Sequence, residues 1–429
     1  MTSVHVEPSR LTGVVEAPPS KSYTHRVFSL ASLCTEKTII HNPLISRDTQ
    51  ATINAAKMLG AEIVEKPGAY TVVGRRRFKT PDNIIDVMNS GTTLRIYTGL
   101  ATLVEKGYTV LTGDESIRRR PMAQLLEALN QIGAECWSTR GNGSAPVIVK
   151  GGNRITGTAK IKGDESSQYV TSLLLTGLAA HGDIEIQVME ELVSKPYVDA
   201  TIKMVEVFGG EIRRRGYEWF RVSPQELRGV EFTVPGDFSS AAFIAAAAHL
   251  TQGQVTIKNL STQYPQADEK IVEIIKLYGS EANYTSEGLV LEGGRNNADV
   301  EVVLRDAPDL LPVTAVIAAV NDGQTRIHGV AHARLKESDR VTLTAAELRK
   351  LGVEVEELAD GLLIHGNPRI KGGVAVDGHG DHRLFMAFTV LGLALEKGLI
   401  VKGAESADVS YPAFLQDLSK LGARIKKTE

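Results

Sequence analysis

A short phrase of the form Leu-Gly-Ala-Glu returns along this 429-residue chain and constrains its fold more than any other feature. It reads LGAEI at 59–63, and its variants are IGAEC at 132–136, FGGEI at 208–212, YGSEA at 278–282, LGVEV at 351–355 and LGARI at 421–425. Successive glycines stand about 70–76 residues apart, a period too long for a solenoid of single hairpins. The chain is therefore predicted to consist of six similar repeats.

Each phrase is predicted to mark a corner between a helix and a strand. In PMAQLLEALNQIGAEC, the apolar residues Leu125, Leu129 and Ile132 recur at helical spacing. The glycine then falls just past the helix end, where a left-handed backbone conformation is needed. Six unrelated helix ends are the plainer interpretation, but they would not be evenly spaced.

A second series of helices runs in phase with the first and is rich in small apolar residues. These helices are expected within 21–33, 89–103, 165–180, 237–250, 308–320 and 380–395. Because they are apolar on nearly all sides, they are predicted to be buried. A short strand separates the two helices of each repeat, and further strands follow the corner. The predicted repeat is βαβαββ, and the predicted fold class is α/β.

Six repeats in a chain of this length predict two similar domains of three repeats each. The first is expected at 21–234, and the second at 1–20 plus 235–429, with the N-terminal VHVEPSRLTGVVEAP supplying its missing strand. Pro18-Pro19 and Pro235-Gly236 are the expected crossover points. Two crossing segments make a hinge, so the active site is expected in the cleft between the domains.

Composition excludes several classes of protein. A net charge of −3 gives no field that would attract nucleic acid or a membrane surface. The start of the chain has no apolar signal-peptide region, and no apolar stretch is long enough to cross a bilayer. Cys34 and Cys136 lack metal-ligand spacing and fit a reducing compartment. We expect a cytoplasmic protein without a membrane or nucleic-acid partner.

Polar residues cluster where the buried helices begin. The clusters are Lys21, Ser22 and Arg26; Asn89, Ser90, Gly91, Thr92 and Arg95; Ser166, Ser167 and Gln168; Asp237, Ser239 and Ser240; Asp306 and Asp309; and Asp381, His382 and Arg383. Most of these residues, taken singly, are ordinary helix caps. Cations at a helix start oppose the helix dipole, and a bound anion would offset that cost. The pattern therefore indicates anionic ligands.

The second helix of each repeat also opens with a polar cluster, in ISRD, SIRRRP, VSKPY, TQYPQAD, ARLKESDR and VSYP. Arg120 precedes Pro121, which is expected at the first helical position. Lys336, Glu337 and Arg340 are expected on one helical turn. A single LKESDR is more often a solvated helix start, but six clusters in phase favour an anionic ligand. No Walker loop or GxGxxG is present to hold a nucleotide.

Eight motifs then identify a resemblance that covers nearly the whole chain. PPSKSYTHR, NSGTTLR, RRRPM, DESSQY, SKPY, PDLLP, LKESDR and GDHR occur in the order found in the 5-enolpyruvylshikimate-3-phosphate synthase family. The chain resembles this family more than the UDP-N-acetylglucosamine enolpyruvyl transferases. Those relatives have Lys-Asn where Lys21-Ser22 stands here, and they carry a reactive cysteine in the loop that here reads GDESIRRRPM.

The resemblance implies both a fold and a reaction. The implied fold has two domains, each of three βαβαββ units around buried parallel helices (an inside-out α/β barrel), which close on substrate. The implied reaction transfers the enolpyruvyl group of phosphoenolpyruvate to the 5-hydroxyl of shikimate 3-phosphate and releases phosphate, by addition and elimination. It belongs to the shikimate pathway to chorismate and aromatic amino acids. It needs no metal or cofactor, a monomer is expected, and glyphosate is the family's inhibitor.

The resemblance also implies residue roles. Shikimate 3-phosphate contacts are expected from Lys21, Ser22, Arg26, Ser166, Ser167, Gln168, Ser194, Tyr197, Asp309 and Lys336. Phosphoenolpyruvate contacts are expected from Lys21, Gly91, Arg120, Gln168, Arg340, His382 and Arg383. Asp309 resembles the base that takes the 5-hydroxyl proton, and Glu337 resembles the acid that protonates the methylene carbon, with Lys21 assisting. At Gly91 a β-carbon is expected to project into the space of the bound anion.

The sequence departs from the family pattern in three places. Val409 stands where the family often has a lysine, whose role Lys402 or another residue would have to supply. Ile96 replaces a frequent proline, and His332 replaces an asparagine. The first departure bears on affinity for phosphoenolpyruvate.

Several alternative interpretations remain open at this stage. One is an enolpyruvyl transferase with a different acceptor, and another is a non-catalytic six-repeat protein that only grips its ligand. His379, Asp381 and His382 also allow a metal-site interpretation. Asp309 would otherwise be a helix cap and Tyr197 a core aromatic. A phosphate-release assay separates the enzymatic alternatives.

Overall fold

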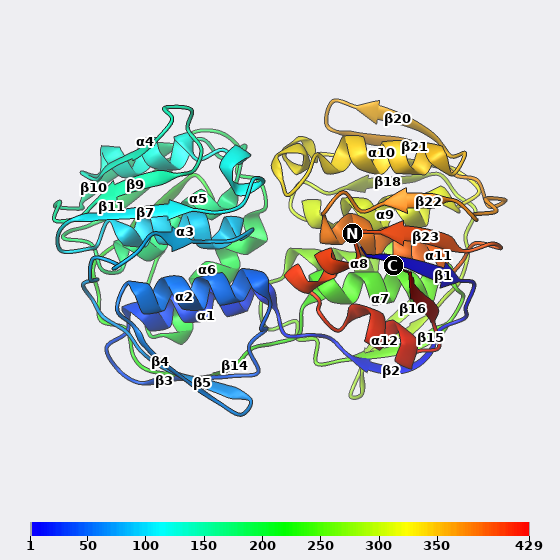
Figure 1. Ribbon diagram of the computed structural model, residues 1–429, viewed down its shortest axis with the longest axis horizontal. Helices are drawn as coiled ribbons and strands as arrows, with labels where there is room; N and C mark the ends of the chain where they lie inside the picture. Colours follow the sequence, from blue (N-terminus) through cyan, green and yellow to red (C-terminus); the bar gives the residue numbers. More distant parts are fainter. Residues whose placement is uncertain (1, 429) are drawn as a thin grey trace. The chain divides into compact units, whose positions relative to one another are not determined.

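The computed structural model describes residues 2–428; Met1 and Glu429, the outermost residues of the second predicted domain, lie outside the described residues. The chain divides into two compact lobes, each with its own hydrophobic core (Figure 1). The central lobe comprises Pro19–Pro235 and the short segment Gln263–Pro265. The terminal lobe comprises the residues up to Pro18, Gly236–Thr262 and the residues from Gln266 onward.

The central lobe contains three four-stranded sheets, six α-helices and one 3-10 turn. Its elements are α1 (Lys21–Leu33), β3 (Thr38–His41), α2 (Arg47–Met58), β4 (Glu62–Lys66), β5 (Ala69–Val73), β6 (Ile85–Asp86), α3 (Gly91–Ala101), β7 (Tyr108–Thr112), η1 (Ile117–Arg119), α4 (Ala123–Gln131), β8 (Glu135–Ser138), β9 (Val147–Lys150), β10 (Gly157–Ile161), α5 (Ser167–Gly177), β11 (Ile184–Val188), α6 (Lys195–Val207), β12 (Arg213–Arg215), β13 (Trp219–Val222) and β14 (Glu231–Thr233). The sheet orders are β14-β3-β5-β4, β6-β7-β9-β8 and β10-β11-β13-β12.

The terminal lobe repeats this plan. Its elements are β1 (Ser3–Glu7), β2 (Thr12–Glu16), α7 (Phe238–Leu250), β15 (Gln254–Lys258), η2 (Ala267–Lys270), α8 (Ile271–Leu277), β16 (Glu281–Thr285), β17 (Gly288–Glu292), β18 (Val300–Val303), η3 (Pro308–Leu310), α9 (Leu311–Ala319), β19 (Gln324–His328), η4 (Ala331–Leu335), α10 (Arg340–Lys350), β20 (Glu354–Leu358), β21 (Gly361–His365), β22 (Ala375–Asp377), α11 (His382–Gly392), β23 (Leu399–Lys402), η5 (Ala404–Val409), α12 (Phe414–Lys420) and β24 (Arg424–Thr428). The sheet orders are β16-β17-β15-β2, β18-β19-β21-β20 and β22-β23-β1-β24.

All six sheets have one topology. In each sheet one edge strand pairs in parallel with its neighbour and the remaining pairs are antiparallel, as in the sheet where β2 runs parallel to β15 and β15 antiparallel to β17. In the first sheet of the central lobe this edge strand is β14, which comes from the end of the lobe. The βαβαββ repeat is therefore confirmed. The sequence predicts that the N-terminal segment supplies one missing strand. In the structure this segment supplies two strands: β1 completes the sheet of the sixth repeat, and β2 completes the sheet of the fourth repeat.

The repeated glycine phrase forms the same helix end in all six repeats. Its glycines Gly60, Gly133, Gly209, Gly279, Gly352 and Gly422 all have positive φ, between 77° and 104°. In the first repeat, the Gly60 N–H donates to the Lys57 carbonyl and the Ala61 N–H to the Ala56 carbonyl, the paired bonds of a Schellman motif, and the same pair recurs at the other five corners. The prediction of left-handed corners is confirmed.

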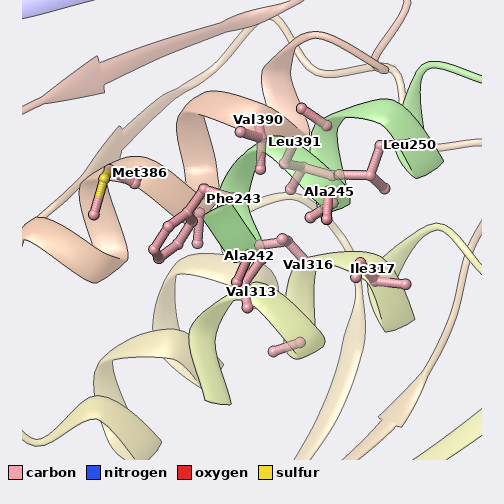
Figure 2. Packing of buried hydrophobic residues seen from close by; sticks show 14 of the residues in the cluster. Ala242, Phe243, Ala245, Leu250, Val313, Val316, Ile317, Met386, Val390 and Leu391 are labelled. Atoms are coloured by element: carbon pink, nitrogen blue, oxygen red, sulfur yellow. The ribbon is translucent and has the colours of Figure 1, made fainter. Parts of the chain in front are cut away.

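The buried helices form the core of each lobe. In the terminal lobe, α7 is buried along nearly its whole length, and Figure 2 shows Ala242, Phe243 and Ala245 packed among Val316 of α9 and Val390 of α11. Many strands, such as β1 and β5, are buried on alternate residues, so they turn one face to the helices and the other outward. Helices inside and sheets outside make the predicted inside-out α/β barrel.

Two predicted helix starts are wrong in detail. α4 begins at Ala123, two residues after Pro121, because Met122 is held in a non-helical conformation and its N–H donates to the Gly143 carbonyl. α10 begins at Arg340, so Lys336 and Glu337 belong to the segment before the helix and not to its first turn. Among residues 2–428, no helix is long and apolar enough to cross a membrane.

Candidate active site

The central lobe gathers its predicted site residues at the starts of α1, α3, α5 and α6. On α1, Lys21 Nζ lies 3.0 Å from Asp48 Oδ2, which belongs to the first turn of α2. Arg26 is 3% exposed and donates to Thr201 Oγ1 (2.9 Å) and to the carbonyl oxygens of Ser22 (2.9 Å) and Tyr197 (2.7 Å). Burial lowers the pKa of Arg26 to about 10, so it is still charged at neutral pH.

Gln168 links the starts of α3 and α5. Its Oε1 accepts from Arg95 Nη1 at 3.0 Å, and its Nε2 donates to Thr92 Oγ1 at 3.1 Å. The Arg95 guanidinium also stacks 5.6 Å from the ring centre of Tyr169. Ser166 caps α5, and its hydroxyl oxygen accepts from the Gln168 N–H. The pair predicted from sequence, Ser166 and Gln168, is therefore brought together.

Gly91 is the first residue of α3 and lies against two guanidinium groups. A β-carbon built there would be 2.5 Å from Arg120 Nη1 and 2.6 Å from Arg95 Nη1. Both arginines are 6% exposed, and Arg120 also donates to Asn89 Oδ1 at 3.3 Å. A side chain at position 91 would thus first displace two buried arginines. This is a more specific reason for a glycine at position 91 than the predicted one, which is that a β-carbon would project into the space of the bound anion.

Ser194 holds a strained position at the start of α6. Its φ of 57° and ψ of 40° are left-handed, which is uncommon for serine, and its side chain makes no capping hydrogen bond. Tyr197, one turn further on, supplies its carbonyl oxygen and its ring face to Arg26, whose guanidinium carbon is 5.9 Å from the ring centre. Strained residues of this kind concentrate at functional sites.

The terminal lobe builds a compact network of charges around Arg340, which is 1% exposed. Arg340 Nη1 donates to Asp309 Oδ1 (2.7 Å), and Nη2 donates to Glu337 Oε2 (2.7 Å). Arg340 Nε donates to Asp381 Oδ2 at 2.8 Å. One guanidinium therefore contacts three carboxylates, two of which the resemblance assigns to acid–base roles.

Asp309 lies between three cations. Its Oδ2 is 2.8 Å from Arg383 Nη2, and its Oδ1 is 3.9 Å from Lys336 Nζ as well as bonded to Arg340. Burial raises the pKa of Asp309, but Arg383, Lys336 and Arg340 outweigh burial and hold it well below its usual value. In this state Asp309 is a firmly ionised carboxylate.

Asp381 organises the start of α11. It is fully buried, its Oδ1 accepts from the Arg383 N–H at 2.9 Å, and its Oδ2 accepts from Ser338 Oγ at 2.9 Å as well as from Arg340. Burial raises the pKa of Asp381, while Arg340 outweighs burial and lowers it. The sequence analysis treats Asp381 as part of a helix-start cluster and as a candidate metal ligand, and it does not predict the contact with Arg340. The signal for this contact is the position of Asp381 inside GDHR, two residues before Arg383.

The metal-site interpretation of GHGDHR does not match the contacts of its residues. His379 Nε2 lies 2.7 Å from Glu347 Oε1, whereas Asp381 bonds to Arg340. His382 is buried, at 1% exposure. Within residues 2–428, no group of three His, Cys, Asp or Glu side chains is arranged to hold a metal ion.

The three departures from the family pattern fall at different places in the lobes. Val409 is 7% exposed at the end of η5, and Lys402 ends β23 with an exposed side chain. Ile96 is buried in the core. His332 is 5% exposed in η4, and burial and the neighbouring Lys336 lower its pKa to about 3, so its imidazole is neutral at neutral pH.

Asp268 is a buried carboxyl group that sequence reasoning missed. It lies in η2, fully buried, and accepts from Ser239 Oγ at 2.5 Å. Burial and the nearby charge of Asp309 raise its pKa to about 6. It belongs to TQYPQAD, one of the polar clusters of the sequence, but nothing in the cluster distinguishes it from the exposed acids around it.

Comparisons with known proteins agree on one family. A family model described as EPSP synthase (3-phosphoshikimate 1-carboxyvinyltransferase) matches residues 6–418. The 3-phosphoshikimate 1-carboxyvinyltransferase of Methanothermobacter thermautotrophicus is 44% identical over 416 residues, covering 97% of each chain. That of Methanococcus vannielii is 40% identical over 424 residues, covering 97% of this chain and 98% of its own. A solved EPSP synthase from Acinetobacter baumannii is similar over 100% of both chains, with a TM-score of 0.83 and 26% identity.

Proposed function

Because the chain belongs to the EPSP synthase family and is a 3-phosphoshikimate 1-carboxyvinyltransferase of the shikimate pathway, we propose that Asp309 and Glu337 are its acid–base pair. The observation that carries this proposal is the position of Arg340, which contacts both carboxylates at 2.7 Å. Arginines of this kind bind carboxylate and phosphate groups in the same geometry. One guanidinium thus connects both proposed catalytic groups to an anion-binding function.

Arg340 and Arg383 have two roles in this proposal. Without substrate they hold Asp309, whose depressed pKa makes it a weak base. When the carboxylate or phosphate of phosphoenolpyruvate engages the two arginines, their contacts with Asp309 are partly replaced, and its proton affinity rises. Substrate binding would thereby convert Asp309 into a base only when the second substrate is present.

The addition step then uses the two carboxyl groups in opposite senses. The 5-hydroxyl oxygen of shikimate 3-phosphate forms a bond to C2 of phosphoenolpyruvate, and its proton passes to Asp309. Glu337 gives a proton to the methylene carbon, and it carries that proton once phosphoenolpyruvate has taken over its contact with Arg340, which otherwise favours the carboxylate. In the elimination step Glu337, now a carboxylate, takes a proton back from the new methyl group as the bond between C2 and the phosphate oxygen breaks, and Asp309 gives its proton to the leaving phosphate, which restores both carboxyl groups. Lys21 assists as a cation or proton carrier.

Shikimate 3-phosphate is proposed to bind mainly through hydroxyl groups and one guanidinium of the central lobe. Arg26 suits the carboxylate, because it is already oriented by three neutral oxygen atoms. Ser166, Ser167 and Ser194 suit the phosphate, and the strained backbone of Ser194 supports this role. Lys336 also suits the phosphate, and the remaining proposed contacts are Lys21, Ser22, Gln168, Tyr197 and Asp309. Phosphoenolpyruvate is proposed to bind through Lys21, Gly91, Arg120, Gln168, Arg340, His382 and Arg383.

Since these residues come from both lobes, we propose that the two lobes act together on one pair of substrates and close upon them, with the boundaries predicted from sequence at 21–234 and 1–20 plus 235–429. The protein is proposed to work as a monomer in the cytoplasm. Glyphosate, an anion with a phosphonate and a carboxylate, is proposed to compete for the phosphoenolpyruvate contacts.

A coupled phosphate-release assay tests the proposed function. Phosphoenolpyruvate with shikimate 3-phosphate should release phosphate, and phosphoenolpyruvate with UDP-N-acetylglucosamine should not. Release with the nucleotide sugar alone would assign a different acceptor. Asp309→Asn and Glu337→Gln test the catalytic pair in the same assay, with Asp306→Asn, a neighbouring acid outside the Arg340 network, as the control that should keep activity.

A further inference from the structure

Four buried polar side chains from three helices of the central lobe form one continuous hydrogen-bond chain. His25 Nδ1 of α1 lies 2.7 Å from Thr52 Oγ1 of α2, which lies 2.7 Å from Thr93 Oγ1 of α3. Thr93 Oγ1 lies 2.7 Å from Ser90 Oγ, the capping residue of α3. None of the four residues is more than 1% exposed. The chain is therefore shielded from water along its whole length.

The hydroxyl groups of Thr52 and Thr93 bond between helices and not to the carbonyl oxygens of their own helices. Thr98 of α3 and Thr389 of α11 each donate to the carbonyl oxygen four residues earlier in their own helix, at 2.7 and 2.8 Å. Thr52 and Thr93 instead bond to each other across two helices, and Thr93 also approaches the Asp48 carbonyl oxygen of α2 at 3.5 Å. Their hydroxyl groups thus join α2 to α3.

The two ends of the chain lie beside residues to which the proposed function assigns substrates. His25 directly precedes Arg26, and it lies one turn after Lys21. Ser90 directly precedes Gly91, and its Oγ accepts from the Thr93 N–H at 3.1 Å, which fixes the first turn of α3. Burial, with Lys21 and Arg26 nearby, lowers the pKa of His25 well below its usual value, so the chain carries a neutral imidazole.

Of the two ends of the hydrogen-bond chain, only the Ser90 end depends on these hydrogen bonds for its position. Arg26 is held independently by Thr201 and by the carbonyl oxygens of Ser22 and Tyr197. The Ser90-Gly91 turn lies close to the Arg95 and Arg120 guanidinium groups, and Ser90 Oγ at the end of the hydrogen-bond chain accepts from the Thr93 N–H in its first turn. Loss of the chain would therefore move the start of α3 more than the start of α1.

We propose that His25, Thr52, Thr93 and Ser90 are positioning residues that hold the Ser90-Gly91 turn and its two arginines in the geometry required by phosphoenolpyruvate. This inference rests on the proposed function, because that proposal places Gly91 and Arg120 at phosphoenolpyruvate. None of the four side chains needs to touch substrate. Their effect should appear in the Michaelis constant for phosphoenolpyruvate and much less in the constant for shikimate 3-phosphate.

Thr52→Val tests the proposal, because it removes two of the three links, those to His25 and to Thr93, while preserving side-chain shape. The Michaelis constant for phosphoenolpyruvate should rise about five- to tenfold, as expected for two lost buried hydrogen bonds. The turnover number and the Michaelis constant for shikimate 3-phosphate should stay within about twofold. Thr52→Ser, which keeps the hydroxyl group, should restore the wild-type constant. Thr93→Val should reproduce the Thr52→Val result.

Thr98→Val is the matched control, since it removes an equally buried hydroxyl from the same helix outside the chain. It should leave both Michaelis constants unchanged. The proposal is overturned if both chain-breaking variants keep the wild-type constant for phosphoenolpyruvate, or if Thr98→Val shifts it equally. It is also overturned if neither breaking variant folds, because the chain would then maintain the lobe as a whole. Absence of phosphate release by the wild type would instead refute the proposed function.

Discussion

The two lobes share a repeat but hold their cations in different ways. In the terminal lobe, Arg340, Arg383 and Lys336 face the carboxylates of Asp309, Glu337 and Asp381. In the central lobe, Arg26, Arg95 and Arg120 donate to hydroxyl, carbonyl and amide oxygens, and Lys21 contacts Asp48. A neutral oxygen orients a guanidinium without cancelling its charge. A carboxylate orients the guanidinium and also cancels its charge.

This difference separates the binding of an anionic substrate from the activation of Asp309 as a base. An anion reaching Arg26 of the central lobe meets a guanidinium that hydroxyl and carbonyl oxygens have already oriented. An anion reaching Arg340 or Arg383 must compete with Asp309, and by doing so it changes the acid–base properties of that carboxylate. In the terminal lobe, each of the three cations therefore has a carboxylate neighbour before any substrate binds.

The largest expected difference between the lobes concerns stability. Arg340→Met leaves Asp381 buried without its guanidinium, and loss of one partner of a buried ion pair costs about 3–5 kcal/mol. Lys21→Met should cost less, because the single buried carboxylate that it leaves, Asp48, lies in the first turn of α2 and keeps the favourable helix dipole. Thermal unfolding of both variants checks this order. Equal melting temperatures would contradict the assigned asymmetry.

The next expectation concerns turnover. Asp309→Asn and Glu337→Gln should each keep the fold and lower kcat about a hundredfold or more, as expected for lost acid–base catalysis. A central-lobe variant such as Ser167→Ala should mainly raise the Michaelis constant for shikimate 3-phosphate. Steady-state kinetics on folded proteins measure both quantities. Wild-type kcat in either carboxyl variant would remove that residue from the mechanism.

Asp268 provides a test by pH. A carboxyl group with a pKa of about 6 in the folded protein, against a usual value of 3.8, binds its proton more tightly in the folded state. Its contribution to the free energy of unfolding is therefore full below about pH 4 and is lost as pH rises to about 6, by roughly 2–3 kcal/mol. Asp268→Asn should be more stable than wild type at pH 7.5 and equal to it near pH 3.5. Parallel stability curves for the two proteins would contradict this assignment.

The smallest expected effect concerns inhibition through the central lobe. The wild type should be sensitive to glyphosate, and Gly91→Ala should raise its inhibition constant about tenfold, since a new β-carbon displaces the Arg95 and Arg120 guanidinium groups. The Michaelis constant for phosphoenolpyruvate should rise less, because glyphosate is the longer molecule. Both constants are measured on both proteins. An unchanged inhibition constant would place Gly91 away from the inhibitor.

Much of the fold was predictable because its signals are local. Gly60 and its five counterparts end their helices by a requirement on their own φ, and the small residues of α7 indicate burial by themselves. The start of α4 was not predictable, since Met122 is held by a loop residue, Gly143, from across the repeat. Local chemistry therefore predicts where repeats turn, but not where contacts between distant segments shift a helix end.

The candidate site likewise contains residues that the sequence predicts and residues that it does not predict. Most of its residues stand in contiguous motifs, which the resemblance carries over. Asp268 and the His25–Thr52–Thr93–Ser90 chain are different, because their significance arises from burial and from partners on other helices. A threonine in a buried helix ordinarily bonds to its own backbone, so Thr52 and Thr93 give no signal in the sequence.

The pairing of β1 has a consequence for synthesis of the protein on the ribosome. β1 lies between β23 and β24, so Val4 has no neighbouring strand until Val401 and Lys427, its partners in the sheet, have been synthesised. At roughly 5–20 residues per second, this strand remains unpaired for about 20–80 s after it is made. The central lobe needs nothing beyond Pro265 and can fold during that interval. β1 is therefore made long before it is incorporated into its sheet, and an unpaired strand of this kind favours aggregation in the interval.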